Sequence, residues 1–421
     1  MISFFNKIKE HTFVLHVITL MSGTALSQGI MFGATPFLTR IYNAEEFGVF
    51  SLYLAIIGPL SIISSWRYES AILLPESEED ARALLYLSIF ITFLMSLFIF
   101  IFIFIFKDMI NSLMTDEFST FLWIVPLGVF ISGLYQIMSS WNSRYEFYRH
   151  LSKSVVLRST IAVSTQISFK TLLNLSGGLV WGNLIASTIA TFYLIRKAII
   201  MNTIVLANIS TDKMKQNAKD YDKFPKYQSF ASLINALSTN APVVLLSTFY
   251  SLEIAGYYAL TNRVLMAPVS LISGSIRNVY YQKAAKIFSK GESIRELFLK
   301  TTFNLFKIGI VPFLLIAIFA KPIFYSLFGT SWGISAVFYQ LLFAWSIMLF
   351  INPPSTTTVL ILGLQKFSLN FTIISLLTRI LALYLGYILY NDFYVSIGLY
   401  ALVGVLLNIF LLLYILKKIP S

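Results

Sequence analysis

Long apolar stretches recur along the chain, and most of the charged residues lie in the segments between them. A stretch of about 20 apolar residues crosses a bilayer once as an α-helix, which satisfies every backbone polar group internally. The pattern predicts an all-α polytopic membrane protein of about 12 transmembrane helices. The predicted spans lie near residues 13–39, 47–66, 83–106, 119–139, 151–172, 177–196, 228–249, 255–277, 301–320, 334–352, 367–390 and 394–416.

One apolar stretch imitates a β-strand. Phenylalanine and isoleucine alternate between Phe93 and Phe106, and alternation with period two is typical of a strand. The length of the stretch and its place among helical spans favour a helix, because an open strand in lipid leaves backbone groups unpaired. We therefore expect a helix over residues 83–106 whose phenylalanines face lipid.

Composition supports the membrane class. Hydrophobic residues make up 57% of the 421 positions and charged residues only 12%, far from the balance of a soluble domain. The absence of cysteine excludes disulfides and cysteine-based metal or redox sites. His11, His16 and His150 are too scattered to form a ligand cluster. We expect no catalytic residue, metal site or cofactor. The first span is too long for the apolar core of a signal peptide, and we expect it to be retained as an anchor.

Basic residues are distributed unevenly between the connecting segments. With the N-terminus assigned to the cytoplasm, 22 Lys and Arg fall on that side and four on the other, namely Arg40, Lys107, Lys170 and Lys321. Cytoplasmic loops carry an excess of Lys and Arg, so both termini are predicted to be cytoplasmic. The net charge of +12 then reflects topology, and no nucleic-acid partner is expected because a bilayer separates the basic loops.

A short motif occurs twice. The pattern Y-x-x-E-x-x-G-x-x-x-L begins at Tyr42 and again 208 residues later at Tyr250, and a proline follows each copy, Pro59 and Pro268. The copies lie between the first and second spans of each half, which predicts two pseudo-symmetric six-helix bundles related by an axis along the membrane normal. The predicted domains are residues 1–199 and 227–421, joined by a Lys-rich cytoplasmic linker at residues 200–226.

Basic residues also occur inside the apolar segments, where we find no Asp or Glu at membrane depth. They are Arg158, Arg263, Arg277, Lys307 and Arg379. A Lys or Arg at the bilayer centre costs about 2.5–3.5 kcal/mol on insertion scales, so such residues usually face a cavity, a partner or water. An anionic substrate is the expected partner.

The segment from Leu38 to Phe50, LTRIYNAEEFGVF, resembles the end of the first helix and the first outer loop of bacterial polysaccharide repeat-unit flippases. These are the O-antigen or Wzx-type branch of the multidrug/oligosaccharidyl-lipid/polysaccharide (MOP) exporter superfamily. The span number, chain length, duplicated plan and basic interior extend the resemblance over the whole chain. It implies a V-shaped pair of six-helix bundles around a central cavity. Such a protein moves an undecaprenyl-diphosphate-linked oligosaccharide from the cytoplasmic to the periplasmic leaflet by alternating access.

The resemblance further implies a place in the cell and a set of partners. It predicts the bacterial inner membrane, a role in lipopolysaccharide biosynthesis, and work beside a polysaccharide polymerase and a chain-length regulator. No G-x-x-x-x-G-K-[ST] motif occurs, so direct use of ATP is not expected. Coupling to a H⁺ or Na⁺ gradient, and driving by product export and polymerisation, both stay open.

Depth separates the basic residues as candidate ligands. Arg379 lies about 18 Å inside the eleventh span and Arg263 about 12 Å inside the eighth, so both are expected to bind the diphosphate through bidentate guanidinium contacts. An arginine on the eighth helix of the related lipid II flippases faces the cavity, which resembles the position of Arg263. Arg158 and Lys307 lie one to two turns from the cytoplasmic end, where they either reach the headgroups or contact substrate. We expect Arg277 to be interfacial.

Uncharged polar residues are candidates for a sugar path. Ser27 and Gln28 lie in the first span, and Asn235 and Asn240 in the seventh. In this fold the two helices face one another across the cavity. Hydrogen bonding between helices is the alternative role for these residues.

Arg67 and Glu69 directly follow the second span. They form either an ion pair at a cytoplasmic gate or part of a solvated loop, and the sequence favours the loop. The acidic run between Glu76 and Asp80 is expected to be a solvated loop or a helix start.

Two other classes compete with the flippase. A multidrug exporter of the same superfamily is expected to carry intramembrane carboxylates, and none is evident in the spans. A membrane-embedded polysaccharide polymerase or ligase is expected to carry a large outer loop with catalytic Arg or His, whereas every long loop here is predicted to be cytoplasmic.

Overall fold

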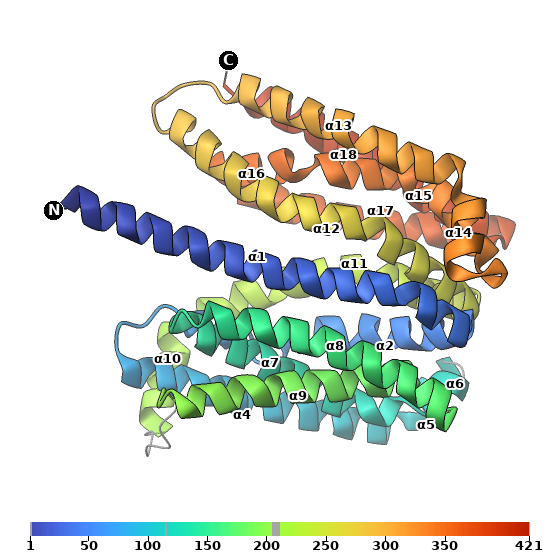
Figure 1. Ribbon diagram of the computed structural model, residues 1–421, viewed down its shortest axis with the longest axis horizontal. Helices are drawn as coiled ribbons and strands as arrows, with labels where there is room; N and C mark the ends of the chain where they lie inside the picture. Colours follow the sequence, from blue (N-terminus) through green and yellow to red (C-terminus); the bar gives the residue numbers. More distant parts are fainter. Residues whose placement is uncertain (1, 114–115, 204–210, 421) are drawn as a thin grey trace. The chain divides into compact units, whose positions relative to one another are not determined.

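A computed structural model describes residues 2–113, 116–203 and 211–420, and all regular structure in these ranges is helical (Figure 1). The helices up to the predicted linker are α1 (Ile2–Ile41), α2 (Ala44–Ile63), α3 (Tyr68–Ala71), α4 (Glu78–Ile105), α5 (Lys107–Leu113), α6 (Asp116–Ser119), η1 (Leu122–Ile124), α7 (Val125–Arg144), α8 (Tyr148–Leu173) and α9 (Gly178–Ile200).

The remaining helices begin within the predicted linker. They are α10 (Thr211–Asp220), η2 (Phe224–Gln228), α11 (Ser229–Phe249), α12 (Leu252–Phe288), α13 (Arg295–Ile318), α14 (Ala320–Phe328), η3 (Thr330–Trp332), α15 (Gly333–Ile351), α16 (Pro353–Ile361), α17 (Gln365–Tyr390) and α18 (Phe393–Lys418).

Among the described residues, nine helical segments are long and apolar enough to cross a membrane, fewer than the twelve predicted. Three further long helices, α1, α8 and α12, fall outside this set. In α8 the reason is visible in the sequence, because Lys153, Arg158 and Lys170 interrupt a segment rich in hydroxyl side chains. The chain is therefore an all-helical membrane protein, and the additional spans stay a prediction.

Helix boundaries depart from the predicted spans at two informative places. The span predicted at 119–139 is shifted, since α7 begins at Val125, with Pro126 in its first turn, and continues to Arg144. The span predicted at 47–66 ends early at Ile63, because Trp66 and Arg67 adopt left-handed backbone angles with φ of 51° and 63°. The strand-like run is helical as predicted, within α4 up to Ile105, and its phenylalanines are exposed, as Phe98 and Phe104 illustrate.

The chain forms two compact units. Unit 1 contains residues 1–42 and 52–236, and unit 2 contains residues 43–51 and 237–421. The start of α2 thus belongs with the C-terminal helices, and α11 passes from one unit to the other. Residues 204–210 of the predicted linker lie outside the described residues, so the proposed linker boundaries stay a prediction.

Unit 1 is built around α8, which packs between α1 and α9. Small residues allow these close contacts: a Cβ added to Gly23 of α1 would lie 2.1 Å from Ser152 Oγ, and one added to Gly182 of α9 would lie 2.6 Å from Gln166 Cγ. The Tyr42 hydroxyl donates to the Gln166 carbonyl over 2.7 Å. This hydrogen bond joins the end of α1 to the backbone of α8.

Unit 2 is organised around α15, which packs against α12, α13 and α18, while α17 packs against α18. Two hydroxyls join α12 to α15. Thr261 Oγ1 donates to the Ser335 carbonyl over 2.9 Å, and Ser335 Oγ donates to the Tyr257 carbonyl over 3.0 Å. Asn352 ends α15, and the following prolines, Pro353 and Pro354, start the short helix α16.

The duplicated motif marks a crossing of α2 and α12 within unit 2. A Cβ added to Gly48 would lie 1.8 Å from the Leu252 carbonyl oxygen, and one added to Gly256 would lie 1.8 Å from the Ala44 carbonyl oxygen. Leu252 follows Ala44 by the same 208 residues that separate the two glycines. The contact is therefore reciprocal, as in an interface between two copies related by a two-fold axis.

The turn after α2 buries an ion pair. Arg67 Nη1 lies 3.0 Å from Glu69 Oε1, and Glu69 is only 2% exposed. The Ser65 hydroxyl donates to the same carboxylate. The prediction of a solvated loop was wrong, because Glu69 lies in the short helix α3, which packs on α4 and α7.

Helix α10 docks on the acidic start of α4. Lys213 Nζ lies 2.5 Å from Glu79 Oε2, and Asn217 Nδ2 donates to Asp80 Oδ1 over 3.1 Å. The hydrogen bond to Glu79 raises the pKa of Lys213. Ser77 caps α4 by accepting from two backbone N–H groups. The acidic run is thus a helix start, as predicted, but it also contacts the segment that links the two halves.

Candidate functional site

Arg379 lies in an aromatic environment inside unit 2. It is fourteen residues from the start of α17, about 21 Å along the helix axis. Its Cζ atom lies 5.5 Å from the centre of the Trp345 ring and 5.8 Å from that of Tyr400. The phenols of Tyr400 and Tyr258 are within electrostatic reach of Arg379. Helices α12, α15 and α18 thus each contribute one aromatic side chain to the surroundings of the guanidinium on α17.

Polar atoms without a partner gather around this arginine. Among the described residues, the Nε of Arg379, the Nε1 of Trp345 and the hydroxyl of Ser375 are buried and make no hydrogen bond. The two nitrogens can only donate. A buried donor without an acceptor is costly, so an oxyanion, a sugar hydroxyl or water is needed to complete the cluster. With the positive charge of Arg379, the cluster is chemically suited to an anionic or hydroxyl-rich ligand.

Arg158 has a comparable position in unit 1. It lies ten residues from the start of α8, about 15 Å along the axis, and is half-buried. Its Cζ lies 5.2 Å from the centre of the Tyr135 ring of α7, and the Tyr53 phenol is within electrostatic reach. Each unit therefore holds an arginine against an aromatic side chain of the preceding long helix, Tyr135 in unit 1 and Trp345 in unit 2.

The other predicted basic ligands have different surroundings. Arg263 is half-buried on α12 and already makes a contact within the protein, so it is not an isolated charge. Lys307 lies on an exposed face of α13, with Nζ 4.5 Å from the centre of the exposed Phe303 ring. This favours the headgroup-reaching interpretation of Lys307. Arg277 is exposed on α12.

The predicted sugar-path residues lie on α1 and α11. Ser27 and Asn240 are half-buried, and Gln28 and Asn235 are exposed. None of these four residues lines the cavity of about 470 Å³ between α1 and α8 of unit 1, where Ser22, Ser152, Lys153 and Thr160 contribute polar groups. Sequence reasoning missed these residues, although the low hydropathy of α8 was a usable signal.

The aromatic partners of Arg379 were also missed. Trp345, Tyr400 and Tyr258 lie in apolar spans, where an aromatic residue is equally expected against lipid or in a helix interface. Only the fold brings them to the arginine. No group of three or more His, Asp or Glu side chains suited to a metal ion occurs in the described part of the chain.

Comparison with known proteins identifies the fold. The lipid II flippase MurJ in an inward closed conformation superimposes with a TM-score of 0.76 at 14% identity, over 97% of this chain and 88% of that one. An inward-facing multidrug resistance MATE transporter of the MOP superfamily gives 0.63 at 14% identity, over 95% of both chains. A mutant form of the Vibrio cholerae MATE transporter VcmN gives 0.60 at 15% identity, over 96% of this chain and 95% of that one.

Comparison of sequences adds the family. No curated protein matches the chain. The family described as polysaccharide biosynthesis protein matches residues 37–337, which is more than half of the chain. The aromatic-bound arginines thus lie in a fold shared with MATE and MurJ proteins, and the predicted relationship is confirmed at the level of the family and the fold. The chain belongs to the polysaccharide biosynthesis protein family, and it has the fold of the MATE and MurJ transporters.

Proposed function

We propose that this protein is a flippase for an undecaprenyl-diphosphate-linked oligosaccharide, such as an O-antigen repeat unit. It works by alternating access in the bacterial inner membrane, with twelve spans and both termini in the cytoplasm. The observation that carries the proposal is the Arg379 cluster, in which buried donors without acceptors surround a guanidinium at membrane depth. A diphosphate and its sugars supply the acceptors that these donors need.

The surroundings of the basic residues suggest which of them bind phosphate and which groups bind sugar. In unit 2, Arg379 is the principal phosphate ligand and Arg263 contributes further positive charge. Arg158 is the corresponding basic candidate of unit 1. The hydroxyl-lined cavity between α1 and α8 offers acceptors and donors for sugar hydroxyl groups. A polysaccharide polymerase and a chain-length regulator would consume the translocated unit.

The leaflet location of the lipid-linked intermediate tests the proposal. A cell without this protein is expected to assemble the intermediate on the cytoplasmic face and to lose surface polysaccharide. The intermediate should be inaccessible to a periplasmic glycosidase in spheroplasts until the gene is restored. Intermediate that is already accessible would indicate a polymerase or ligase defect. Normal polysaccharide with increased drug sensitivity would indicate a multidrug exporter.

A further inference from the structure

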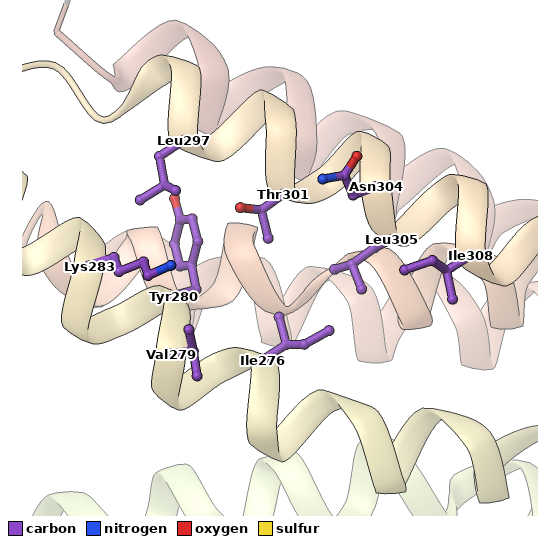
Figure 2. Close-up of a pocket in the computed structure, with 9 residues that line it drawn as sticks. All are labelled: Ile276, Val279, Tyr280, Lys283, Leu297, Thr301, Asn304, Leu305 and Ile308. Atoms are coloured by element: carbon purple, nitrogen blue, oxygen red, sulfur yellow. The ribbon is translucent and has the colours of Figure 1, made fainter.

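A groove separates α12 and α13 in unit 2 (Figure 2). Both helices pack on α16. The Tyr280 hydroxyl of α12 is 2.8 Å from Thr358 Oγ1 of α16, and this hydrogen bond holds the Tyr280 side chain in place at the floor of the groove. The groove has a volume of about 330 Å³.

The open side of the groove is suited to hydrocarbon. Val279 on one rim is 54% exposed and Ile308 on the other is 61% exposed, whereas Leu305 and Tyr280 on the floor are buried. Only 28% of the 18-residue apolar stretch of α13 is buried inside the protein, although this helix is apolar enough to span a membrane. The groove therefore opens where the protein meets lipid tails.

Polar groups lie toward one end of the groove. Thr301 and Asn304 are about 9 and 13 Å from the start of α13, and Ile308 is about 20 Å from it. Lys283 of α12 lies at the same end as Leu297 and Thr301 (Figure 2). Among the described residues, Thr301 and Asn304 make no side-chain hydrogen bond, and Lys283 makes no ion pair. Along the groove the order is a cation, then hydrogen-bond donors, then aliphatic side chains.

We propose that this groove binds one glycerophospholipid. Its phosphate lies at Lys283, an ester carbonyl accepts hydrogen bonds from Thr301 and Asn304, and an acyl chain lies along Leu305 and Ile308. The order of groups in the groove is the order in the lipid, from phosphate through esters to hydrocarbon. A polyprenyl phosphate has no ester carbonyl, so the donors at Thr301 and Asn304 favour a phospholipid over the carrier lipid of the proposed cargo.

The site goes beyond the proposed transport function and does not depend on it. Lys283 precedes Lys286 and Lys290 on the segment predicted to be cytoplasmic, so the lipid would come from the cytoplasmic leaflet. It would fill the space between two helices that meet through α16. Its binding can be measured on the purified protein without any transport assay.

Native mass spectrometry of the full chain, delipidated in detergent, tests the proposal with phosphatidylglycerol as the probe. The wild-type protein should retain one molecule with a defined affinity. Lys283→Ala should weaken retention about tenfold, in line with the loss of one charge-assisted contact, and Lys283→Arg should preserve it. Lys286→Ala, one turn away and outside the groove, is the matched control and should change nothing.

Two further measurements separate the occupants. The double variant Thr301→Val/Asn304→Leu should weaken phosphatidylglycerol binding and leave undecaprenyl phosphate binding unchanged. Ile308→Trp, at the exposed rim, should block the groove without disturbing the core. This variant tests the site even if one of the other variants fails to fold. Equal retention by the wild type, Lys283→Ala and Ile308→Trp would overturn the site. Tighter binding of undecaprenyl phosphate, insensitive to the double variant, would assign the groove to the carrier lipid instead.

Discussion

The guanidinium of Arg379 needs stabilising contacts because it lies at membrane depth. A guanidinium at this depth is expensive, and the protein surrounds it with aromatic rings and one phenol while its Nε is left without a partner. Aromatic faces stabilise a cation without neutralising it. The arginine therefore keeps its capacity to bind an anion.

Replacement of Arg379 tests this interpretation. Arg379→Ala should abolish export of surface polysaccharide while the amount of protein in the membrane is unchanged or slightly higher, because a costly charge has been removed. Arg379→Lys should restore export only partly, since an ammonium lacks the guanidinium fork. Trp345→Phe keeps a ring but removes the N–H, and should reduce export about tenfold.

Export and membrane abundance are measured together by polysaccharide staining and immunoblotting. Arg277→Ala removes an exposed arginine from the same unit and should leave export near the wild-type level. Loss of the Arg379→Ala protein from the membrane would show that Arg379 is structural and would remove it from the site.

Tyr145, just beyond α7, gives a pH-dependent prediction. Burial and a hydrogen bond to Glu78 raise its pKa to about 12. The folded state thus favours the neutral phenol, so this stabilisation is complete below the ordinary tyrosine pKa of about 10 and is lost as pH rises through the folded value. Thermal melting of the purified protein between about pH 9 and 12, a range chosen around these values, should show a smaller alkaline loss for Tyr145→Phe than for the wild type. Identical pH profiles would contradict the assignment.

At the scale of helices, the crossing of α2 and α12 depends on two glycines. A Cβ at Gly256 would lie 1.8 Å from a backbone oxygen, which cannot rotate away as a side chain can. Gly256→Ala should therefore force the helices apart and destabilise the protein by about 1–3 kcal/mol or more. Gly398→Ala is the control, because no atom lies within 4 Å of its added Cβ. The melting temperature in detergent should be lower than that of the wild type for Gly256→Ala, and equal or higher for Gly398→Ala. Equal curves would refute the close crossing.

The helices could be predicted from the sequence where their bounds depend on the hydropathy of the residues that form them. Hydropathy located α4 and α18 within a few residues, because the bilayer imposes apolar length on each span. It placed the end of α2 too late, since left-handed angles at Trp66 and Arg67 leave no mark in a hydropathy profile. It also gave no indication that Glu69 is buried, because burial there depends on helices that are distant in sequence.

The candidate site was predictable only in part for the same reason. A charge in an apolar span stands out, so Arg379 and Arg158 were found. Trp345 and Tyr400 were not, because aromatic residues are common throughout the spans and only tertiary packing brings them to the guanidinium. Their helices are separated along the chain from α17, and a single sequence carries no record of that contact.

At the scale of the whole molecule, the orientation in the membrane rests on the 22-to-four split of basic residues. The chain has no cysteine, so single cysteines can report on each side. Ser289→Cys, exposed after α12, should resist a membrane-impermeant thiol reagent in intact cells, and Asn391→Cys, exposed before α18, should react. Both should react in inverted or permeabilised membranes, which confirms accessibility. The opposite labelling in intact cells would reverse the topology.

The reciprocal crossing of α2 and α12 carries an implication about the two halves of the chain. Gly48 meets the residue that matches Ala44, and Gly256 meets Ala44 itself, as corresponding surfaces do in a symmetric homodimer. A half-length chain that carries one copy of the motif is therefore expected to meet a second copy of itself through the same glycine. Each copy of the motif constrains the other, because a residue larger than glycine at Gly48 or Gly256 would clash with the backbone of the opposite helix. The two copies of the motif in one chain thus meet as two identical surfaces do across a two-fold axis.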